Sequence, residues 1–129
     1  TKIAVGGDDA SQIHVILRDI IGINKDNYPK YKLLVNSSKT EIAEVIKKDA
    51  TASKFNIQYS ITYDLYNLYK ECIIYSKEIN TMSSYNVKSA GYSFGSDISQ
   101  KESMTQNIMN NAHKFISSLN ALSEREDCN

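Results

Sequence analysis

Residues 55–79 read FNIQYSITYDLYNLYKECIIYSKEI, and the interpretation of the other segments depends on this stretch. It contains five of the nine tyrosines and the densest apolar pattern of the chain. Apolar residues recur in it at spacings of four and three, which is the period of an α-helix. They are Ile57, Ile61, Leu65, Leu68, Cys72, Tyr75 and Ile79. The spacing predicts a long, buried central helix.

A second apolar stripe widens the buried arc of this predicted helix. Its members are Tyr59, Tyr63, Tyr66 and Ile73. A helix that is apolar over most of its circumference has to be covered on several sides, by its own domain or by a neighbouring subunit. The other interpretation is that the tyrosine rings pack while their hydroxyl groups reach water. Tyr59, Tyr63 and Tyr66 are therefore candidate protein-interface residues.

The composition limits the class of protein. A chain of 129 residues predicts a single helical domain, 1–129, long enough to bury a core without metal or disulfide bonds. Its 15 basic and 15 acidic residues give a net charge of zero, so no broad electrostatic surface for nucleic acid or an anionic membrane is expected. Neutrality permits copies of the chain to associate.

The two cysteines are predicted to be reduced. Cys72 lies on the apolar stripe and is expected to be a packed thiol, whereas Cys128 lies in a predicted frayed tail, 123–129. We therefore expect no disulfide between them. No apolar run approaches the ~20 residues that span a bilayer, and residues 1–9 lack the features of a signal peptide. These observations predict synthesis in the cytoplasm.

The segments before the central helix predict two shorter helices. Residues 1–7 form an extended arm in this interpretation, and Asp8, Asp9 and Ser11 are N-cap candidates for a helix that stops at Gly22. Its predicted core face is Ile13, Ile16, Leu17 and Ile20. A second helix runs over 29–49, or restarts at 36–38, where a capping-box spacing occurs. The apolar residues keep the same helical phase before and after residues 36–38, which favours one continuous helix.

The segments after the central helix predict a loop and a last helix. Residues 80–97 are rich in Ser, Asn and Gly, and Tyr85, Val87, Tyr92 and Phe94 sit at alternate positions in its regular parts. A lone strand in a helical chain needs an edge from another chain, so this stretch is predicted to be an extended interaction loop. The helical period returns over 98–122. The fold class is therefore mainly α, a small bundle of about four helices.

No set of residues points to catalysis, a cofactor or a metal. His14 and His113 have no carboxylate or cysteine at ligand spacing. The triplet at residues 7–9, Gly-Asp-Asp, looks like a metal-binding polymerase turn, but the chain is too short for that domain and helix capping needs the same residues. Ser93, within GYSFG, lacks the sheet that a nucleophile elbow requires. We therefore predict that the protein is not an enzyme.

Two stretches resemble the head-tail connector (adaptor) proteins of tailed bacteriophages. Residues 15–46, VILRDIIGINKDNYPKYKLLVNSSKTEIAEVI, are similar to the start of those proteins. Residues 87–94, VKSAGYSF, look like the segment that they carry between their last two helices. The resemblance implies interface roles for the residues of this second stretch. They are Val87, Lys88, Ser89, Gly91, Tyr92 and Phe94.

This resemblance implies a structural protein of the virion. The chain would form a homo-oligomeric ring, commonly of twelve copies, between the portal protein and a further neck or tail protein, with the genome passing through and no membrane contact. It would be made in the host cytoplasm. The alternative is a small helical regulatory or protein-binding domain; base-facing arginines would favour a nucleic-acid role, and only Arg18 and Arg125 exist.

Overall fold

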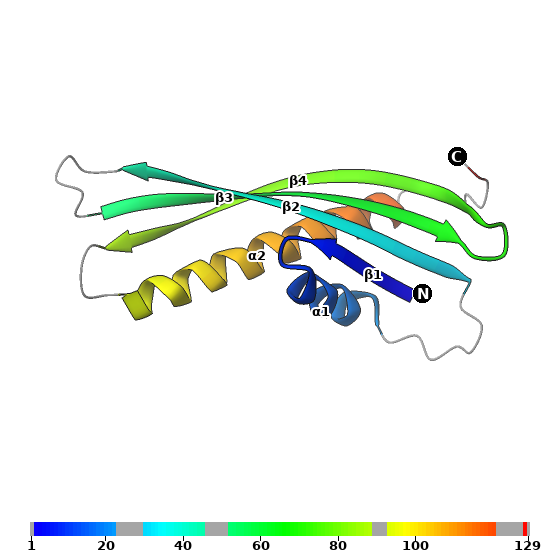
Figure 1. Cartoon of the computed structure of the whole chain (residues 1–129), viewed down its shortest axis with the longest axis horizontal. Helices are drawn as coiled ribbons and strands as arrows, with labels where there is room; N and C mark the ends of the chain where they lie inside the picture. The colour runs from blue at the N-terminus through cyan, green and yellow to red at the C-terminus, as the bar shows by residue number, and fades with distance from the viewer. Residues whose placement is uncertain (1, 23–29, 46–51, 89–92, 121–127, 129) are drawn as a thin grey trace.

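The structure, a computed structural model, describes residues 2–22, 30–45, 52–88, 93–120 and 128. It has four strands and two helices. They are β1 (Lys2–Gly7), α1 (Ala10–Ile21), β2 (Tyr31–Val45), β3 (Ala52–Asn67), β4 (Cys72–Lys88) and α2 (Ser93–Asn120). The predicted helical bundle is therefore wrong. The chain forms a mixed α/β fold around one four-stranded sheet (Figure 1).

The stretch that predicted a central helix forms the hairpin of β3 and β4. Ile57, Tyr59, Ile61 and Tyr63 are all buried, while the polar residues between them point to the other face. A strict alternation of this kind is the period of a strand. The spacing of four residues that indicated a helix is also a multiple of two, so Ile57 and Ile61 fit both periods. Leu68 lies in the turn rather than on a helix.

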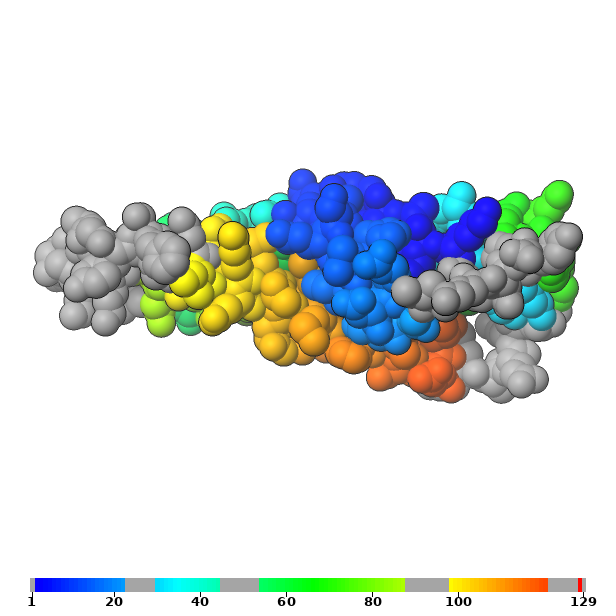
Figure 2. All heavy atoms as spheres, turned by 90° about the horizontal axis from the view of Figure 1, so that it is seen from below, coloured from blue at the N-terminus to red at the C-terminus, as the bar shows by residue number. Residues whose placement is uncertain are grey.

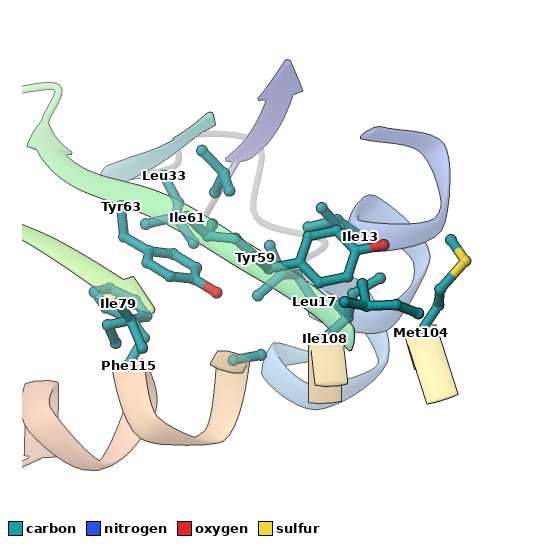
Figure 3. Packing of buried hydrophobic residues seen from close by; sticks show 13 residues of the cluster. Ile13, Leu17, Leu33, Tyr59, Ile61, Tyr63, Ile79, Met104, Ile108 and Phe115 are labelled. Atoms are coloured by element: carbon teal, nitrogen blue, oxygen red, sulfur yellow. The ribbon is translucent and has the colours of Figure 1, made fainter. Parts of the chain in front are cut away.

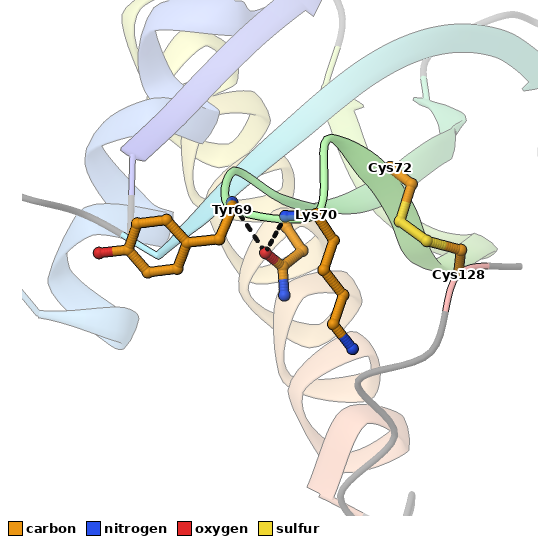
Figure 4. Close-up of a disulfide and its surroundings, with 5 residues drawn as sticks. Tyr69, Lys70, Cys72 and Cys128 are labelled. Atoms are coloured by element: carbon orange, nitrogen blue, oxygen red, sulfur yellow. Dashed lines mark hydrogen bonds between the residues drawn. A yellow bond between two sulfur atoms is a disulfide. The ribbon is translucent and has the colours of Figure 1, made fainter.

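The sheet runs in the order β1-β2-β3-β4. β1 is parallel to β2, and the two hairpin pairs β2–β3 and β3–β4 are antiparallel. The β3–β4 turn is fixed by Asn67, whose Oδ1 accepts hydrogen bonds from the main-chain N–H groups of Tyr69 and Lys70 at 2.9 and 3.0 Å (Figure 4). Such a side-chain contact is the usual device of a tight turn at Asn.

Three further segments differ from their predicted structure. The expected helix over 29–49 is the strand β2, and the expected arm over 1–7 contains β1. The expected loop over 80–97 is divided between two elements, because residues 80–88 belong to β4 and residues 93–97 begin α2. Val87 and Lys88 pair with Ser53 and Ala52 of β3, so this part of the segment finds its partner within the chain.

The predictions of a first and a last helix are confirmed, although α2 begins at Ser93 and not at residue 98. α1 follows Asp9 and is capped by Gly22, whose N–H donates to the main-chain oxygen of Arg18 at 2.8 Å. α2 buries Met104, Ile108, Ala112 and Phe115.

Both helices pack on the same face of the sheet (Figure 1), and Figure 2 shows them side by side on that face. The core lies between them and the sheet (Figure 3). In it the ring of Tyr63 stacks on that of Phe115, with centroids 4.2 Å apart. Within the described part of the chain, no element covers the opposite face of the sheet. This leaves one broad sheet surface for contact with other molecules.

Candidate interaction face of the sheet

A row of polar side chains on α2 joins this helix to the sheet. Asn107 Nδ2 donates to the main-chain oxygen of Ile57 at 2.8 Å, and Asn111 Nδ2 donates to that of Ile79 at 2.9 Å. Thr81 of β4 links the two amides, since its hydroxyl donates to Asn107 at 2.6 Å and accepts from Asn111 at 2.9 Å. Buried polar groups that are fully paired in this way fix one relative position of two elements.

Asparagine side chains are mostly found at the protein surface, but both of these lie inside the protein. Asn107 and Asn111 are 1% and 0% exposed. A signal was present in the sequence, because Ser103, Asn107 and Asn111 recur every four residues and border the apolar stripe of the helix. A polar row at helical spacing beside an apolar row indicates a partner that offers hydrogen bonds, as a sheet with Thr81 does.

The buried tyrosines are held by hydrogen bonds from their hydroxyl groups. Tyr59 donates to Asp9 Oδ2 at 2.6 Å, and Tyr63 donates to Asn111 Oδ1 at 2.7 Å. Burial raises the pKa of both phenols above the usual range, and the Asp9 carboxylate raises that of Tyr59 further. These two phenols are therefore part of the core, which corrects the interpretation that they reach water.

The turn before α1 uses its two carboxylates to hold neighbouring strands. Asp8 Oδ2 accepts from the main-chain N–H of Lys39 at 2.8 Å, and Asp9 Oδ2 lies 3.1 Å from Lys39 Nζ. Asp9 is the N-cap residue, yet its side chain makes no capping hydrogen bond. The carboxylates that suggested either helix caps or a metal-binding turn thus bind strand β2. Among the described residues, no group of three or more His, Cys, Asp or Glu could hold a metal ion.

The uncovered surface, here called the open face, consists mainly of small uncharged polar side chains. It alternates with the core residues along β2, β3 and β4, and these side chains are exposed or half-buried. Its central members are Asn36, Ser38, Thr40, Gln58, Ser60, Thr62, Asn80 and Ser84. A surface of this composition offers many hydrogen-bond donors and acceptors with little charge.

The open face carries few charged side chains, and its two hollows are open to solvent. Two of its carboxylates have partners, since Ser60 Oγ donates to Glu78 at 2.7 Å and Ser76 Oγ donates to Asp64. Two open hollows of about 370 and 280 Å³ lie on it, one between Ser38 and Asn80 and one beside Gly6. Enclosed pockets are the usual sites of small ligands. The open face is shaped instead for a broad contact.

The predicted interface residues that the structure describes lie on different elements. Tyr59 and Tyr63 are buried under the helices, while Tyr66 is half-buried. Val87 and Lys88 end β4, and the main chain of Phe94 lies in the first turn of α2. Ser89, Gly91 and Tyr92 lie outside the described residues. A shared interface role for these nine positions stays untested.

Cys72 and Cys128 form a disulfide, which corrects the prediction of two free thiols (Figure 4). Their Cα atoms are 5.8 Å apart, within the range of disulfides in proteins. Cys72 is the first residue of β4. The bond therefore joins the second residue from the C-terminal end of the sequence to the start of an edge strand.

Sequence comparisons and structure comparisons give different results. The sequence matches no protein-family model and no curated protein. The structure is similar to a protein of Caulobacter crescentus classed as a lipoprotein, with a TM-score of 0.69 and 14% identity over 92% of this chain and 85% of that one. It is similar to a minor lipoprotein of Acinetobacter baumannii, with a TM-score of 0.57 and 8% identity over 93% of this chain and 90% of that one. It is also similar to rare lipoprotein B of Shewanella oneidensis, with a TM-score of 0.56 and 8% identity over 94% of this chain and 95% of that one.

These similarities define the class of fold and overturn the predicted function. The fold is the α/β fold found in these bacterial lipoproteins, and it is matched over nearly the whole chain. The resemblance to phage head-tail connectors is therefore wrong, and so are the predicted place in the virion neck and the alternative of a helical regulatory domain. The ring of copies and the portal contact stay untested.

Proposed function

We propose that this chain is the folded domain of a bacterial cell-envelope lipoprotein, and that it binds a partner protein through the open face without catalysing a reaction. The observation that carries the proposal is the arrangement of one long sheet with both helices on one face. The three lipoproteins named above have the same fold. This fold leaves the open face, which is polar and broad, free for a partner.

The disulfide supports a location outside the cytoplasm. Structural disulfides persist in the periplasm and at the cell surface, whereas cytoplasmic thiols are kept reduced. Neither α1 nor α2 has the length and apolarity needed to cross a bilayer.

The partner that fits the open face is a protein surface rich in hydrogen-bonding groups and poor in charge. The centre of the face, around Ser60 and Thr62, carries short side chains that lose little rotamer freedom on contact. Both residues belong to β3, which is paired with β2 on one side and with β4 on the other, so their side chains are held at fixed spacing. A small molecule would find little enclosure there, and a nucleic acid would find little positive charge.

The location is tested by fractionating cells that express the full-length natural protein. We expect it in the membrane fraction, released by detergent, with Cys72 and Cys128 resistant to alkylation until a reductant is added. A cytoplasmic protein with two freely alkylated thiols would contradict the proposal.

The face is tested by placing a photo-crosslinking amino acid at Ser38, on the open face, and at Gln106, which is exposed on α2. We expect one discrete protein adduct from position 38 and none from position 106. The identified partner is then purified and its binding measured with a Ser38→Arg variant, which should bind at least about tenfold more weakly. The same adducts from both positions, or unchanged binding by the variant, would refute a role of the open face.

A further inference from the structure

The two helices leave an open hollow between them on the outer side of the helix layer. It has a volume of about 410 Å³ and is called the inter-helix groove here. Figure 2 looks onto this layer, with α1 in blue beside α2 in yellow to orange. Its lining includes Gln12, Val15 and Ile16 of α1 and Lys101, Met104 and Thr105 of α2. The groove is therefore separated from the open face by the sheet.

The inter-helix groove has apolar side chains at its base and along its lips. Ile16 and Met104 belong to the core or pack against it, so they form the base. Val15, on one lip, is 46% exposed. On α2, Ile98 and Met109 lie one turn outside the lining residues at either end and are 42% and 36% exposed. Exposed apolar side chains that gather in this way indicate a contact surface.

This lining favours a helix as the occupant. Val15 and Ile16 carry no hydrogen-bonding group, and Met104 carries only a weak acceptor. The main-chain groups in the interior of α1 and α2 are already paired within each helix. An extended segment would therefore leave its own N–H and C=O groups unpaired against the groove, which costs free energy. A helix pairs those groups internally and presents only side chains.

The charges along the groove have opposite signs. Lys101 is the one charged residue of its lining. Asp19 follows Ile16 by three residues and Gln12 by seven, so it lies on the same side of α1, about 10 Å beyond Gln12 along the helix. Within the described part of the chain, neither Lys101 nor Asp19 forms an ion pair. An occupant that fits carries an acidic and a basic residue in matching places.

A second copy of the chain offers no helix that fits this groove. Such a helix needs apolar residues one turn apart along its exposed side. In α1 the exposed stripe has Val15 between Ser11 and Arg18, and in α2 about three turns separate Ile98 from Met109. An anionic membrane attracts faces rich in Lys and Arg, whereas this groove has one cation. The occupant that remains is a helix of another protein.

We propose that the inter-helix groove binds an amphipathic helix of a partner protein, with an acidic residue beside Lys101 and a basic residue nearer Asp19. The apolar stripe of this helix covers Val15, Ile98 and Met109. It also packs on Met104, whose flexible side chain adapts to the shape of a partner. Insertion of an amphipathic helix into an apolar groove is a known mode of recognition. The site does not rest on the function proposed for the open face.

The probe is a synthetic peptide of about 14 residues, four helical turns, with one stripe of leucines and with Glu and Lys near opposite ends. It is made in both charge orders, and the tighter-binding order is used with the full chain, its disulfide formed. We expect the peptide to gain helix on binding, as measured by circular dichroism. Val15→Asp should weaken binding at least about tenfold, whereas Met82→Asp, at an exposed apolar residue of the open face, should change it less than about twofold.

The charge contact is tested with a reversal on each partner. Lys101→Glu should weaken binding of this peptide about fivefold, and a second peptide with Lys in place of Glu should bind the variant more tightly than the parent. Lys114→Glu is the matched control, because Lys114 is exposed on the side of α2 next to β4, and it should change binding less than about twofold. Equal binding of both peptides by the Lys101→Glu variant would overturn the assignment of an acidic residue to this place.

Four other results would overturn the proposal. Two concern the peptide, namely equal binding by the parent and by Val15→Asp, and binding without a gain of helix. Anionic phospholipid vesicles that bind the parent but not Val15→Asp would assign the groove to a membrane surface. A dimer of the parent that Val15→Asp dissociates would assign it to a second copy of the chain.

Discussion

The side-chain amide of Asn107, on α2, donates a 2.8 Å hydrogen bond to the main-chain oxygen of Ile57 in the middle of β3. Asn107 also donates to Ser83 Oγ at 3.0 Å and accepts from Thr81, so each polar atom of its side chain has a partner. The amide thus reaches both strands of the hairpin. Its loss would remove a hydrogen bond from groups on both strands.

We predict that Asn107→Leu lowers the free energy of unfolding by about 2–4 kcal/mol, because Thr81 and two acceptors lose a buried partner. Asn110→Leu is the matched control. This residue is exposed on the same helix, and its replacement should change stability by less than about 0.5 kcal/mol. Urea unfolding of both variants measures the difference, and equal values would show that the polar row does not hold α2 in place.

Gly7 and Gly6 offer a second matched pair. Gly7 has a φ of 88°, and a Cβ there would lie 2.1 Å from the main-chain oxygen of Ser37, whereas a Cβ at Gly6 would meet its nearest atom at 3.7 Å. Gly7→Ala should therefore cost at least about 2 kcal/mol and Gly6→Ala less than about 1 kcal/mol. A Gly7→Ala protein with the melting temperature of the parent would mean that the turn between β1 and α1 is formed differently.

The disulfide should contribute substantially to stability. It connects residues separated by 56 positions, and the chain-entropy estimate for a loop of that length is about 4 kcal/mol. Cys128→Ser should lower the melting temperature as much as Cys72→Ser with Cys128→Ser does, since either change removes the bond. If the reductant-treated parent melts at the temperature of the oxidised protein, the bond adds nothing to the folded state.

The helices could be predicted from the sequence because other local features agree with their apolar repeat. In α1, Ile13 and Leu17 repeat at four residues and Gly22 ends the pattern. In α2, Ile108, Ala112 and Phe115 repeat over a long segment without proline. Such signals depend only on neighbours in the sequence.

The sheet was not predicted because the apolar spacing of residues 55–79 was compared with the period of a helix alone. In β3 the residues Ile57 and Ile61 satisfy both the helical and the strand spacing. Tyr59 and Tyr63 separate the two, since they share that face in a strand and not in a helix. The disulfide and the buried state of Asn107 depend on contacts between distant segments. No local pattern around Cys128 contains that information.

The two buried tyrosines, Tyr59 and Tyr63, should lower the free energy of unfolding at high pH. Burial raises the pKa of Tyr63, and burial together with the hydrogen bond to Asp9 raises that of Tyr59. In the unfolded chain both phenols lose their protons near the ordinary tyrosine pKa of about 10. Above that pH the unfolded state binds fewer protons than the folded state, so the free energy of unfolding falls as pH rises.

We therefore predict that stability is constant with respect to these two residues below about pH 9 and falls above about pH 10, by up to ~1.4 kcal/mol per pH unit for each phenol. Tyr63→Phe should lose about 1 kcal/mol at neutral pH, because the hydrogen bond to Asn111 is lost, yet show a shallower decline at high pH. Urea unfolding across this range measures both effects. Ultraviolet absorbance provides the independent check: if all nine tyrosines of the folded protein ionise together near pH 10, neither phenol is shielded as the structure requires.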